Sequence, residues 1–520
     1  MGVAMSEVAW AGLALAGCLG LWLWLRLRPG AACSQRRRVR AALQRMPGCP
    51  ALPLLGTTYR MLGLKRRELF ASLDKTTRQY GPVFRTWNGS HGVVHLSEAE
   101  HIEIVLRSTV NIQKGYVYSF LKPWLGTGLL TSSGAKWHSH RKLITPAFHF
   151  NILDSFVEVF ADKSEILVSR LEKEVGNSKG FDVYPYITRC ALDIICETAM
   201  GTEMNAQDET DSPYLKAVCE LTELIIQRIG KPWLHSDFTY SLTDQGAKFK
   251  DNLRILHDFT KKVIKERKEA MKNSEEFNNG TEDLFGRKKR MVFLDLLLEA
   301  SKGGTVLSDE EIREEVDTFM FGGHDTTSTS MCWTLYLMAL HLDVQEKVYE
   351  EQMEIFQGSD RKPTMKDLSE MKYLERVIKE SLRLYPIAPF ITRQVTQDIE
   401  IGEYCLPEGS QVMLHIYHVH RNHKYFPEPE TFNPDNFLPE RVLTRHPFAY
   451  VPFSAGSRNC IGQKFALLEE KAVLSAVVRR FRLRALDPPS RLQLLWELVL
   501  RPADGVRLTL QPRSTTPTDY

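Results

Sequence analysis

Apolar residues recur at spacings of three and four along much of the chain, which is typical of helices that bury one face. Helices are predicted over 151–174, 212–229, 247–271, 308–342, 370–385 and 461–481. The longest of these begins at Ser308, and Glu311 three residues later completes an N-terminal capping box. Alternating patterns typical of strands are few, at Val83 to Trp87, Val93 to Leu96 and Val412 to Ile416. The pattern predicts a mainly α protein with small β-sheets.

The N-terminal segment follows a different pattern. Val8 to Leu25 is an uncharged apolar run of about the length that spans a bilayer as a helix. Basic residues follow it between 26 and 40, whereas Glu7 precedes it. By the positive-inside bias, the N-terminus is expected in the lumen and the rest of the chain in the cytosol. The alternative is a cleaved secretory signal ending near Ala31, which the lack of a basic segment before the apolar run disfavours.

The rest of the chain shows no clear division into separate domains. We predict a signal-anchor transmembrane segment over 1–28, a basic and proline-rich hinge over 29–56, one catalytic domain over 57–511 and a tail over 512–520. Prolines between 46 and 53 favour a stiff extended chain in the hinge. The polar, glycine-containing stretch from Asn273 to Arg290 is predicted to be an exposed loop within the catalytic domain.

Composition and charge narrow the class of protein. Apolar residues make up 43% and charged residues 25%, the balance of a folded protein with a large core. A formal net charge of +3 and the absence of long basic runs argue against nucleic acid as a partner. The 9 cysteines show no framework spacing, which indicates reduced thiols.

The most specific chemistry lies around Cys460. Turn-forming residues precede it and a helical pattern follows, so its thiol lies near a helix N-terminus that would stabilise the metal-binding thiolate. Taken alone, such a cysteine is usually structural. However, Phe453 to Gly462 reads F-x-x-G-x-R-x-C-x-G and so resembles the haem-binding signature of cytochromes P-450. The resemblance implies that Cys460 is the proximal ligand of a haem b iron, that Phe453 packs near the sulfur and that Arg458 binds a propionate.

Further haem contacts follow from the same resemblance. Trp137 and Arg141 match the family's W-x-x-x-R, and Arg393 falls where another propionate-binding arginine is expected. Together with Arg458, the two arginines would neutralise two propionates inside an apolar domain.

A glycine pair, Gly322 and Gly323, lies within the predicted long central helix. Each glycine destabilises a helix interior by about 1 kcal/mol relative to alanine. For a pair standing alone, close helix packing is the usual reason. The run Gly322 to Thr327 resembles the family's oxygen-binding segment, in which a missing side chain leaves room over the haem. Thr326 can bond back to the carbonyl of Gly322 and loosen the helix. We expect Thr326 to hold a proton-donating network and Asp325 to refill it through water.

Two structural motifs also match the family. Glu380 and Arg383 form the E-x-x-R pair that fixes the fold beneath the haem, but the next motif, P-E-R-F, reads Pro434-Asp435-Asn436-Phe437. Because Asn436 cannot make the bidentate contact of an arginine, the usual network is either weakened or completed from elsewhere.

The resemblance is most specific for the fourth family of animal cytochromes P-450, the fatty-acid hydroxylases, and within it for the vertebrate subfamily V. It is carried by Pro123 to Leu130, Cys190 to Met200 and Glu315 to Phe321. It implies oxidation of fatty acids at or near the terminal methyl, in the endoplasmic reticulum membrane. The chain has no dinucleotide motif, so it needs a partner that supplies electrons. The resemblance implies that this partner is NADPH–cytochrome P-450 reductase, with cytochrome b5 as a further partner.

Two alternatives stay open. One is a monooxygenase of broader lipophilic specificity with in-chain hydroxylation, and the other is a haem-binding protein without turnover, against which Asp325 and Thr326 argue. The family's segment commonly reads F-E-G-H-D-T-T, with a glutamate that becomes esterified to the haem, where this chain has Gly322. We therefore expect non-covalent haem and a roomier cavity roof, which would relax the demand for the terminal methyl.

Overall fold

The computed structural model describes residues 31–53, 55–209, 211–278, 292–301 and 307–513. The predicted membrane segment lies outside these ranges, and within them no helix combines the length and apolar character needed to cross a bilayer. The predicted hinge contains a helix that the sequence reading did not anticipate, α2 (Ala31–Gln44). The proline-rich stretch after it is extended, as expected, with isolated bridges at Gly48 and Leu52.

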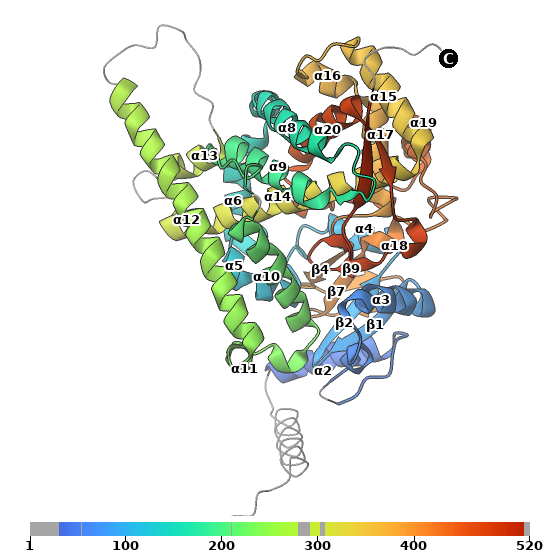
Figure 1. Cartoon of the computed structure of the whole chain (residues 1–520). Helices are drawn as coiled ribbons and strands as arrows, with labels where there is room; N and C mark the ends of the chain where they lie inside the picture. The colour runs from blue at the N-terminus through green and yellow to red at the C-terminus, as the bar shows by residue number, and fades with distance from the viewer. Residues whose placement is uncertain (1–30, 54, 210, 279–291, 302–306, 514–520) are drawn as a thin grey trace, which may run out of the picture.

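A single long helix, α14 (Asp309–Leu340), crosses the interior and organises the helical part of the molecule (Figure 1). The predicted capping box is present, because Ser308 Oγ accepts from the N–H of Glu311 and the Glu311 side chain accepts in return. The predicted second and last helices appear as α10 (Pro213–Ile229) and α20 (Gln463–Arg480), and the fifth as α17 (Lys372–Leu384).

Two predicted helices differ from what is observed. The range 151–174 is divided into α7 (Phe150–Asp154) and α8 (Val157–Leu171). The range 247–271 lies within the longer α12 (Asp244–Asn278), so the first residues of the predicted exposed loop are helical, and the rest lie outside the described residues.

Most of the other helices were not predicted. The α-helices are α3 (Arg66–Tyr80), α4 (Ala99–Arg107), α5 (Lys122–Leu125), α6 (Gly134–Ile144), α9 (Tyr184–Ile195), α11 (Asp237–Ser241), α13 (Phe293–Ala300), α15 (Leu342–Phe356), α16 (Met365–Glu370), α18 (Ile416–Val419) and α19 (Pro439–Thr444). Short 3₁₀ segments and one π segment, η5, join them: η1 (Thr58–Met61), η2 (Tyr116–Leu121), η3 (Thr145–Phe148), η4 (Glu172–Glu174), η5 (Cys196–Met200), η6 (Pro232–Leu234), η7 (Pro434–Phe437), η8 (Pro447–Ala449), η9 (Gly456–Arg458) and η10 (Pro489–Arg491).

The largest sheet has the strand order β1-β2-β7-β4 and lies at one side of the helices, beside α3 (Figure 1). Its strands are β1 (Val83–Asn88), β2 (His91–Leu96), β7 (Gln411–His415) and β4 (Phe390–Gln394). The first two predicted strands form the antiparallel pair β1–β2, whereas β2 and β7 are parallel. The smaller sheets are β3-β11-β8, β5-β6 and β10-β9, with strands β3 (Phe181–Asp182), β5 (Ile399–Ile401), β6 (Tyr404–Leu406), β8 (Phe481–Ala485), β9 (Leu494–Trp496), β10 (Leu500–Pro502) and β11 (Arg507–Pro512).

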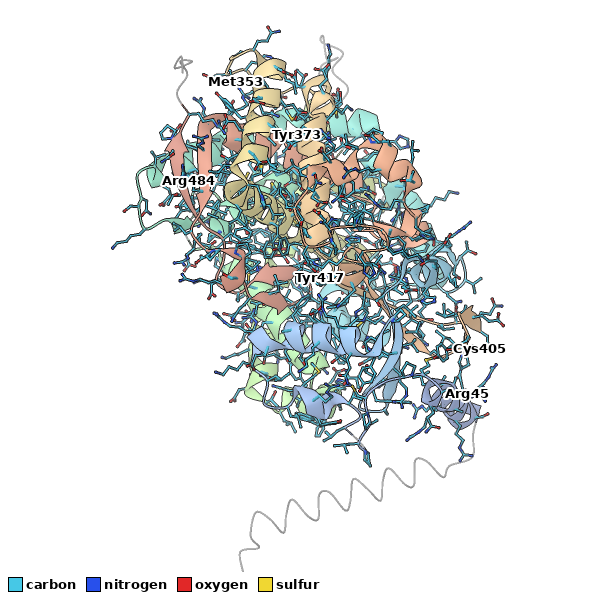
Figure 2. All side chains as sticks on the ribbon, turned by 90° about the vertical axis from the view of Figure 1, so that its right-hand side faces the viewer. Arg45, Met353, Tyr373, Cys405, Tyr417 and Arg484 are labelled. Carbon is cyan, nitrogen blue, oxygen red and sulfur yellow. The ribbon has the colours of Figure 1, made fainter. Side chains whose placement is uncertain are left out.

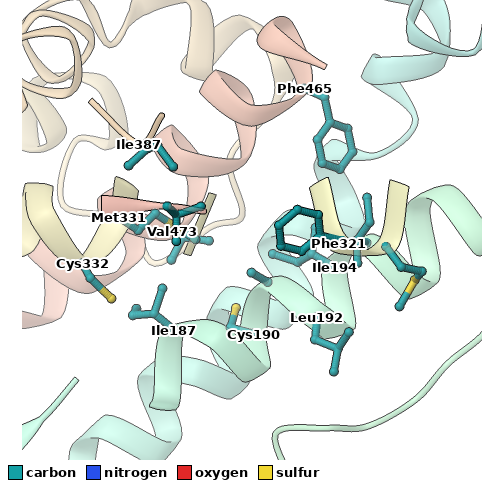
Figure 3. Close-up of a cluster of buried hydrophobic side chains, with 14 of the residues drawn as sticks. Ile187, Cys190, Leu192, Ile194, Phe321, Met331, Cys332, Ile387, Phe465 and Val473 are labelled. Carbon is teal, nitrogen blue, oxygen red and sulfur yellow. The ribbon is translucent and has the colours of Figure 1, made fainter. Parts of the chain in front are cut away.

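The main hydrophobic core lies where α9, α14 and α20 meet. Figure 3 shows Ile187 and Cys190 of α9 below Met331 and Cys332 of α14, with Val473 of α20 close by. All five side chains are buried. This packing fixes the position of α14 against the helix that follows Cys460, and so places the two halves of the predicted site.

Candidate functional site

A cavity of about 540 Å³ brings together the segments that the sequence singled out. Cys460 and Phe453 line one side of it, and Gly322, Gly323 and Thr326 of α14 line another. The cavity wall also contains Trp137, Arg141 and Arg458, whereas Arg393 and Asp325, which the sequence also predicted for the site, are not lining residues.

Cys460 lies just before α20, as the sequence predicted. Its N–H donates to the carbonyl of Phe453 at 2.9 Å, which closes the turn before the helix. The thiol lies deep in the protein, and its exposed surface faces the cavity that it lines. Burial raises the pKa of Cys460, whereas the N–H of Gly462 and the charge of Arg141 oppose that shift. A cationic metal in the cavity would complete the stabilisation of the thiolate.

Four cations lie in this region: Arg141, Arg458 and Lys114 line the cavity, and Arg393 lies near the last two of these. Arg458 donates to the carbonyl of Ser132 at 2.9 Å and lies 4.5 Å from the centre of the Trp137 ring. Burial, with Arg393 nearby, lowers the pKa of Arg458 to about 9. Arg393 is also buried, and its side chain donates to the carbonyl of Thr392 at 3.1 Å.

The fourth cation is Lys114, which the sequence reading missed. Its ammonium lies 4.7 Å from the centre of the Tyr118 ring, and burial with Arg393 and Arg458 holds its pKa well below the usual value. In the described part of the chain, neither it nor those two arginines pairs with a carboxylate. An isolated bridge joins Lys114 to Arg393, and backbone hydrogen bonds between Gly115 and Thr392 and between Gln394 and Gln113 hold the same two segments together. No local motif could reveal these contacts.

Arg141 is placed differently from the sequence expectation. Its guanidinium donates to the carbonyl and to Oδ1 of Asn459, both at 2.8 Å, directly beside Cys460. It therefore supports the turn that carries the cysteine as well as lining the cavity. Lys114, Arg393 and Arg458, none paired with a carboxylate in the described ranges, still fit a group that carries two carboxylates. Haem has this chemistry, so the residues present fit the cofactor that the signature implies.

The two glycines of α14 serve different purposes. A Cβ at position 322 would meet nothing within 4 Å, so Gly322 leaves open space in the cavity roof. A Cβ at position 323 would lie 2.5 Å from Cδ1 of Ile195, so Gly323 permits close packing of α14 on α9. Open space therefore explains Gly322, and close helix packing explains Gly323. The predicted bond from Thr326 Oγ1 to the carbonyl of Gly322 is present at 2.6 Å.

Asp325 is directed away from the cavity. Its side chain is buried and forms an ion pair with Arg501, which also lies 3.3 Å from Glu497. Glu497 in turn pairs with Arg66, whose side chain is 39% exposed and therefore reaches solvent. Asp325 is not among the residues that line the cavity, so its carboxylate does not reach the Thr326 network from the cavity side. The sequence reading missed Arg501 because its partner is 176 residues away.

The E-x-x-R pair is a fully buried ion pair with complete hydrogen bonding. Arg383 Nε and Nη2 donate to Glu380 at 2.8 and 2.7 Å, and Arg383 also donates to carbonyls of the segment before η7. Asn436 Nδ2 donates to Glu380 at 3.1 Å, and the N–H of Asn433 does so at 2.9 Å. Arg445 bonds the carbonyl of Asn436 at 2.6 Å. The network is thus completed from elsewhere, the second of the two outcomes left open by the sequence.

Comparison with known proteins agrees with this geometry. A model of the family "Cytochrome P450" matches residues 46–509. "Cytochrome P450 4c3" of Drosophila melanogaster is 48% identical over 490 residues, covering 92% of this chain and 91% of its own length. "Cytochrome P450 4c21" of Blattella germanica is 47% identical over 480 residues, covering 92% and 95%. "Cytochrome P450 4V2" of Homo sapiens is 45% identical over 468 residues, covering 89% of each chain. The chain therefore belongs to the cytochrome P450 family, and within it to the fourth family.

Proposed function

We propose that this cytochrome P450 inserts one oxygen atom of O₂ into C–H bonds of fatty acids at or near the terminal carbon, with electrons from NADPH through a reductase. The observation that carries the proposal is the form of the cavity. Its lining includes Cys460, Thr326 and Leu498 and, on α3, Leu69 and Leu73, and most of the lining side chains are aliphatic or aromatic. A long apolar chain with one end near Cys460 fits this form.

The residues of this chain have separate tasks in that reaction. When bound, the haem supplies an iron whose thiolate ligand favours O–O cleavage. Cys460 holds the metal, and Lys114, Arg393 and Arg458 neutralise the propionates. The Thr326 hydroxyl, 2.6 Å from the Gly322 carbonyl, stands at the cavity wall where it can pass a proton from water. Asp325 with Arg501 positions this turn of α14 and supplies charge behind it.

Non-covalent attachment of the haem is part of the proposal. Two carboxylates line the cavity in the described part of the chain, and both are engaged: Glu470 accepts from Ser330 Oγ at 2.9 Å, and Glu497 pairs with Arg501. Thr318 and Thr326 lie one turn from Gly322 on either side. Acid-acetone extraction should therefore separate haem from the polypeptide, and haem that stays with the chain would contradict this part of the proposal.

The open space at Gly322 favours a second candidate, oxidation of inner carbons or of bulkier lipophilic compounds. A side chain at this position would narrow the roof and restrict how the ligand approaches. Product profiles from a saturated acid, a polyunsaturated acid and a set of drugs, all with reductase present, decide between the two. Gly322→Glu should raise the ratio of terminal to in-chain products, with Gly322→Ala as the matched smaller change.

We also propose that the chain is anchored in the endoplasmic reticulum membrane with its catalytic domain in the cytosol, and that cytochrome b5 can assist the reductase. The support is the apolar run and charge asymmetry of the N-terminal segment. Removal of Met1 to Arg28 should weaken membrane association without abolishing it. In sealed microsomes, externally added protease should degrade the catalytic domain, and a protected domain would contradict the orientation.

A further inference from the structure

The side chains of three histidines are joined by hydrogen bonds between the four-stranded sheet and α3, and we call this series the histidine relay. Nδ1 of His95 lies 2.8 Å from Nε2 of His415, and Nδ1 of His415 lies 3.3 Å from Nδ1 of His418. The relay starts at the cavity wall, where Nε2 of His95 lies 2.7 Å from Oγ1 of Thr86 and both residues line the cavity. It ends at α3, where Oδ1 of Asp74 lies 3.0 Å from Nε2 of His418. None of the predicted haem-site residues belongs to this series of hydrogen bonds.

The hydrogen bonds run from the buried His95 and His415 to Asp74, whose side chain is 26% exposed. Figure 2 shows α3 across the front of the molecule with Tyr417 near it. The rings are not arranged as metal ligands, since no group of His, Cys, Asp or Glu in the described ranges could hold a metal ion. The two hydrogen bonds at the ends of the relay, at 2.7 and 3.0 Å, have ordinary geometry. The arrangement is therefore read as a relay of hydrogen bonds.

The carboxylate of Asp74 sets the direction of every bond in the relay. Burial raises the pKa of Asp74, but hydrogen bonds from His418 and Arg78 outweigh this and lower it, so the group is ionised and only accepts. A neutral His418 then donates from Nε2 and accepts at Nδ1. His415 must donate from Nδ1 and accept at Nε2, and His95 must do the same.

An independent contact fixes the middle ring in the same tautomer. The hydroxyl of Thr77 donates to the carbonyl of Leu73 at 3.0 Å. Its oxygen can therefore only accept from Nδ1 of His415, which is 3.4 Å away. The hydrogen bonds that begin at Asp74 also require a hydrogen on Nδ1 of His415. Two separate observations therefore agree on the tautomer of His415.

The surroundings keep the rings uncharged. Burial lowers the pKa of His95 to about 3 and holds that of His415 well below the usual value. The pKa of His418 is lowered by burial and raised by Asp74, with a net decrease. The charged groups that face this end of the relay are Asp74 and Arg78 of α3, and Arg421 with its partner Glu430. At the other end, Phe84 stacks on His95 with ring centres 4.3 Å apart.

The direction of the hydrogen bonds in the relay fixes which way the hydroxyl of Thr86 donates. Because Nε2 of His95 carries a lone pair, the Thr86 hydrogen is donated to it, and Oγ1 can offer only lone pairs to a ligand in the cavity. A carboxylate or an ester, which only accepts, gains nothing from this oxygen. A ligand group with an O–H bond satisfies it.

We propose that Thr86, with the relay behind it, is a head-group subsite for a long-chain ligand that ends in an O–H donor, either a fatty alcohol or a fatty acid in its neutral form. The inference rests on the proposed function and adds to it the ionisation state in which the substrate is held.

Equilibrium dialysis of the full-length, haem-loaded protein tests this with three probes of equal chain length: the alcohol, the acid and the methyl ester of the acid. The alcohol should bind about three- to tenfold more tightly than the ester, the equivalent of one net hydrogen bond. Binding of the acid should weaken as the pH rises from about 5 to about 8, while binding of the alcohol should not change. Acid binding that strengthens with pH would overturn the proposal, because it would indicate a carboxylate held by a cation such as Arg60, which also lines the cavity.

Two variants separate the subsite from general packing. Thr86→Val removes the acceptor and should abolish the advantage of the alcohol over the ester. His95→Phe keeps an aromatic ring on Phe84 but frees the Thr86 hydroxyl to donate, so the ester should then bind at least as tightly as the alcohol. Thr392→Val, on the same face of the sheet and with a hydroxyl that has no partner among the described residues, is the matched control and should keep the wild-type ranking.

The outcomes also distinguish this inference from the proposed function. A wild-type ranking that survives in both Thr86→Val and His95→Phe would overturn the inference. The expected ranking without oxidation of any long-chain compound would leave the subsite standing and count against the proposed function alone.

Discussion

The adjacent glycines of α14 should respond in opposite ways to the same substitution. Replacing glycine by alanine in a helix interior stabilises the helix by about 1 kcal/mol. At position 322 the new Cβ meets nothing within 4 Å, so Gly322→Ala should raise the free energy of unfolding by about this amount.

At position 323 the new Cβ would lie 2.5 Å from Cδ1 and 2.6 Å from Cγ1 of Ile195. Overpacking of this kind costs about 1–3 kcal/mol. After the helix gain, Gly323→Ala should lower the free energy of unfolding by up to about 2 kcal/mol. The two alanine variants should therefore differ by about 1–3 kcal/mol, although each adds a single methyl group.

A second substitution identifies the clash as the cause. Ile195→Ala should cost about 2–5 kcal/mol alone. Combined with Gly323→Ala it should cost less than the sum by at least about 0.5 kcal/mol, since the new methyl fills part of the space. Urea unfolding of the haem-loaded protein, followed by circular dichroism, gives these values. Equal effects of the two alanine variants, or strict additivity with Ile195→Ala, would refute the reasoning.

The haem site supplies three further predictions. Cys460→Ala should lose the thiolate-type carbon monoxide difference spectrum, and a Soret maximum near that of the wild-type complex would show that the ligand assignment is wrong. Thr326→Ala should still allow iron reduction but release hydrogen peroxide in place of product, so unchanged coupling of NADPH use to product would contradict its role. Lys114→Met should speed haem transfer to an acceptor protein, whereas Lys122→Met at an exposed position should not, and equal rates would exclude Lys114 from the propionate contacts.

Features set by neighbours in the sequence could be predicted, because their geometry follows from helix and turn rules. The cap at Ser308, the bond from Thr326 to Gly322 and the place of Cys460 before a helix are of this kind. The motifs also identified the buried pair Glu380–Arg383, whose members are three residues apart.

Contacts between distant segments could not be predicted from the pattern. The direction of Asp325 depends on Arg501, and the charge of Lys114 matters only because β4 brings Arg393 beside it. The helix over Ala31–Gln44 was missed because its many basic residues suggested a solvated hinge. The contacts that hold α2 in place come from β6 and β2, which are distant in the sequence. Arg445 was missed for a similar reason, since it reaches Asn436 only after the chain has turned through α19.

The strand order of the main sheet also has a consequence during synthesis. The cavity wall formed by β2 is completed only when β7 pairs with it, and His95 and His415 are 320 residues apart in the chain. At about 5–20 residues per second, a ribosome takes roughly 15–60 seconds to make that interval. Throughout this time the β1–β2 hairpin has an unpaired edge and an uncovered apolar face, which invites association with other chains. We therefore expect the early part of the molecule to need chaperones during synthesis, and slowed translation between the two strands should increase its aggregation.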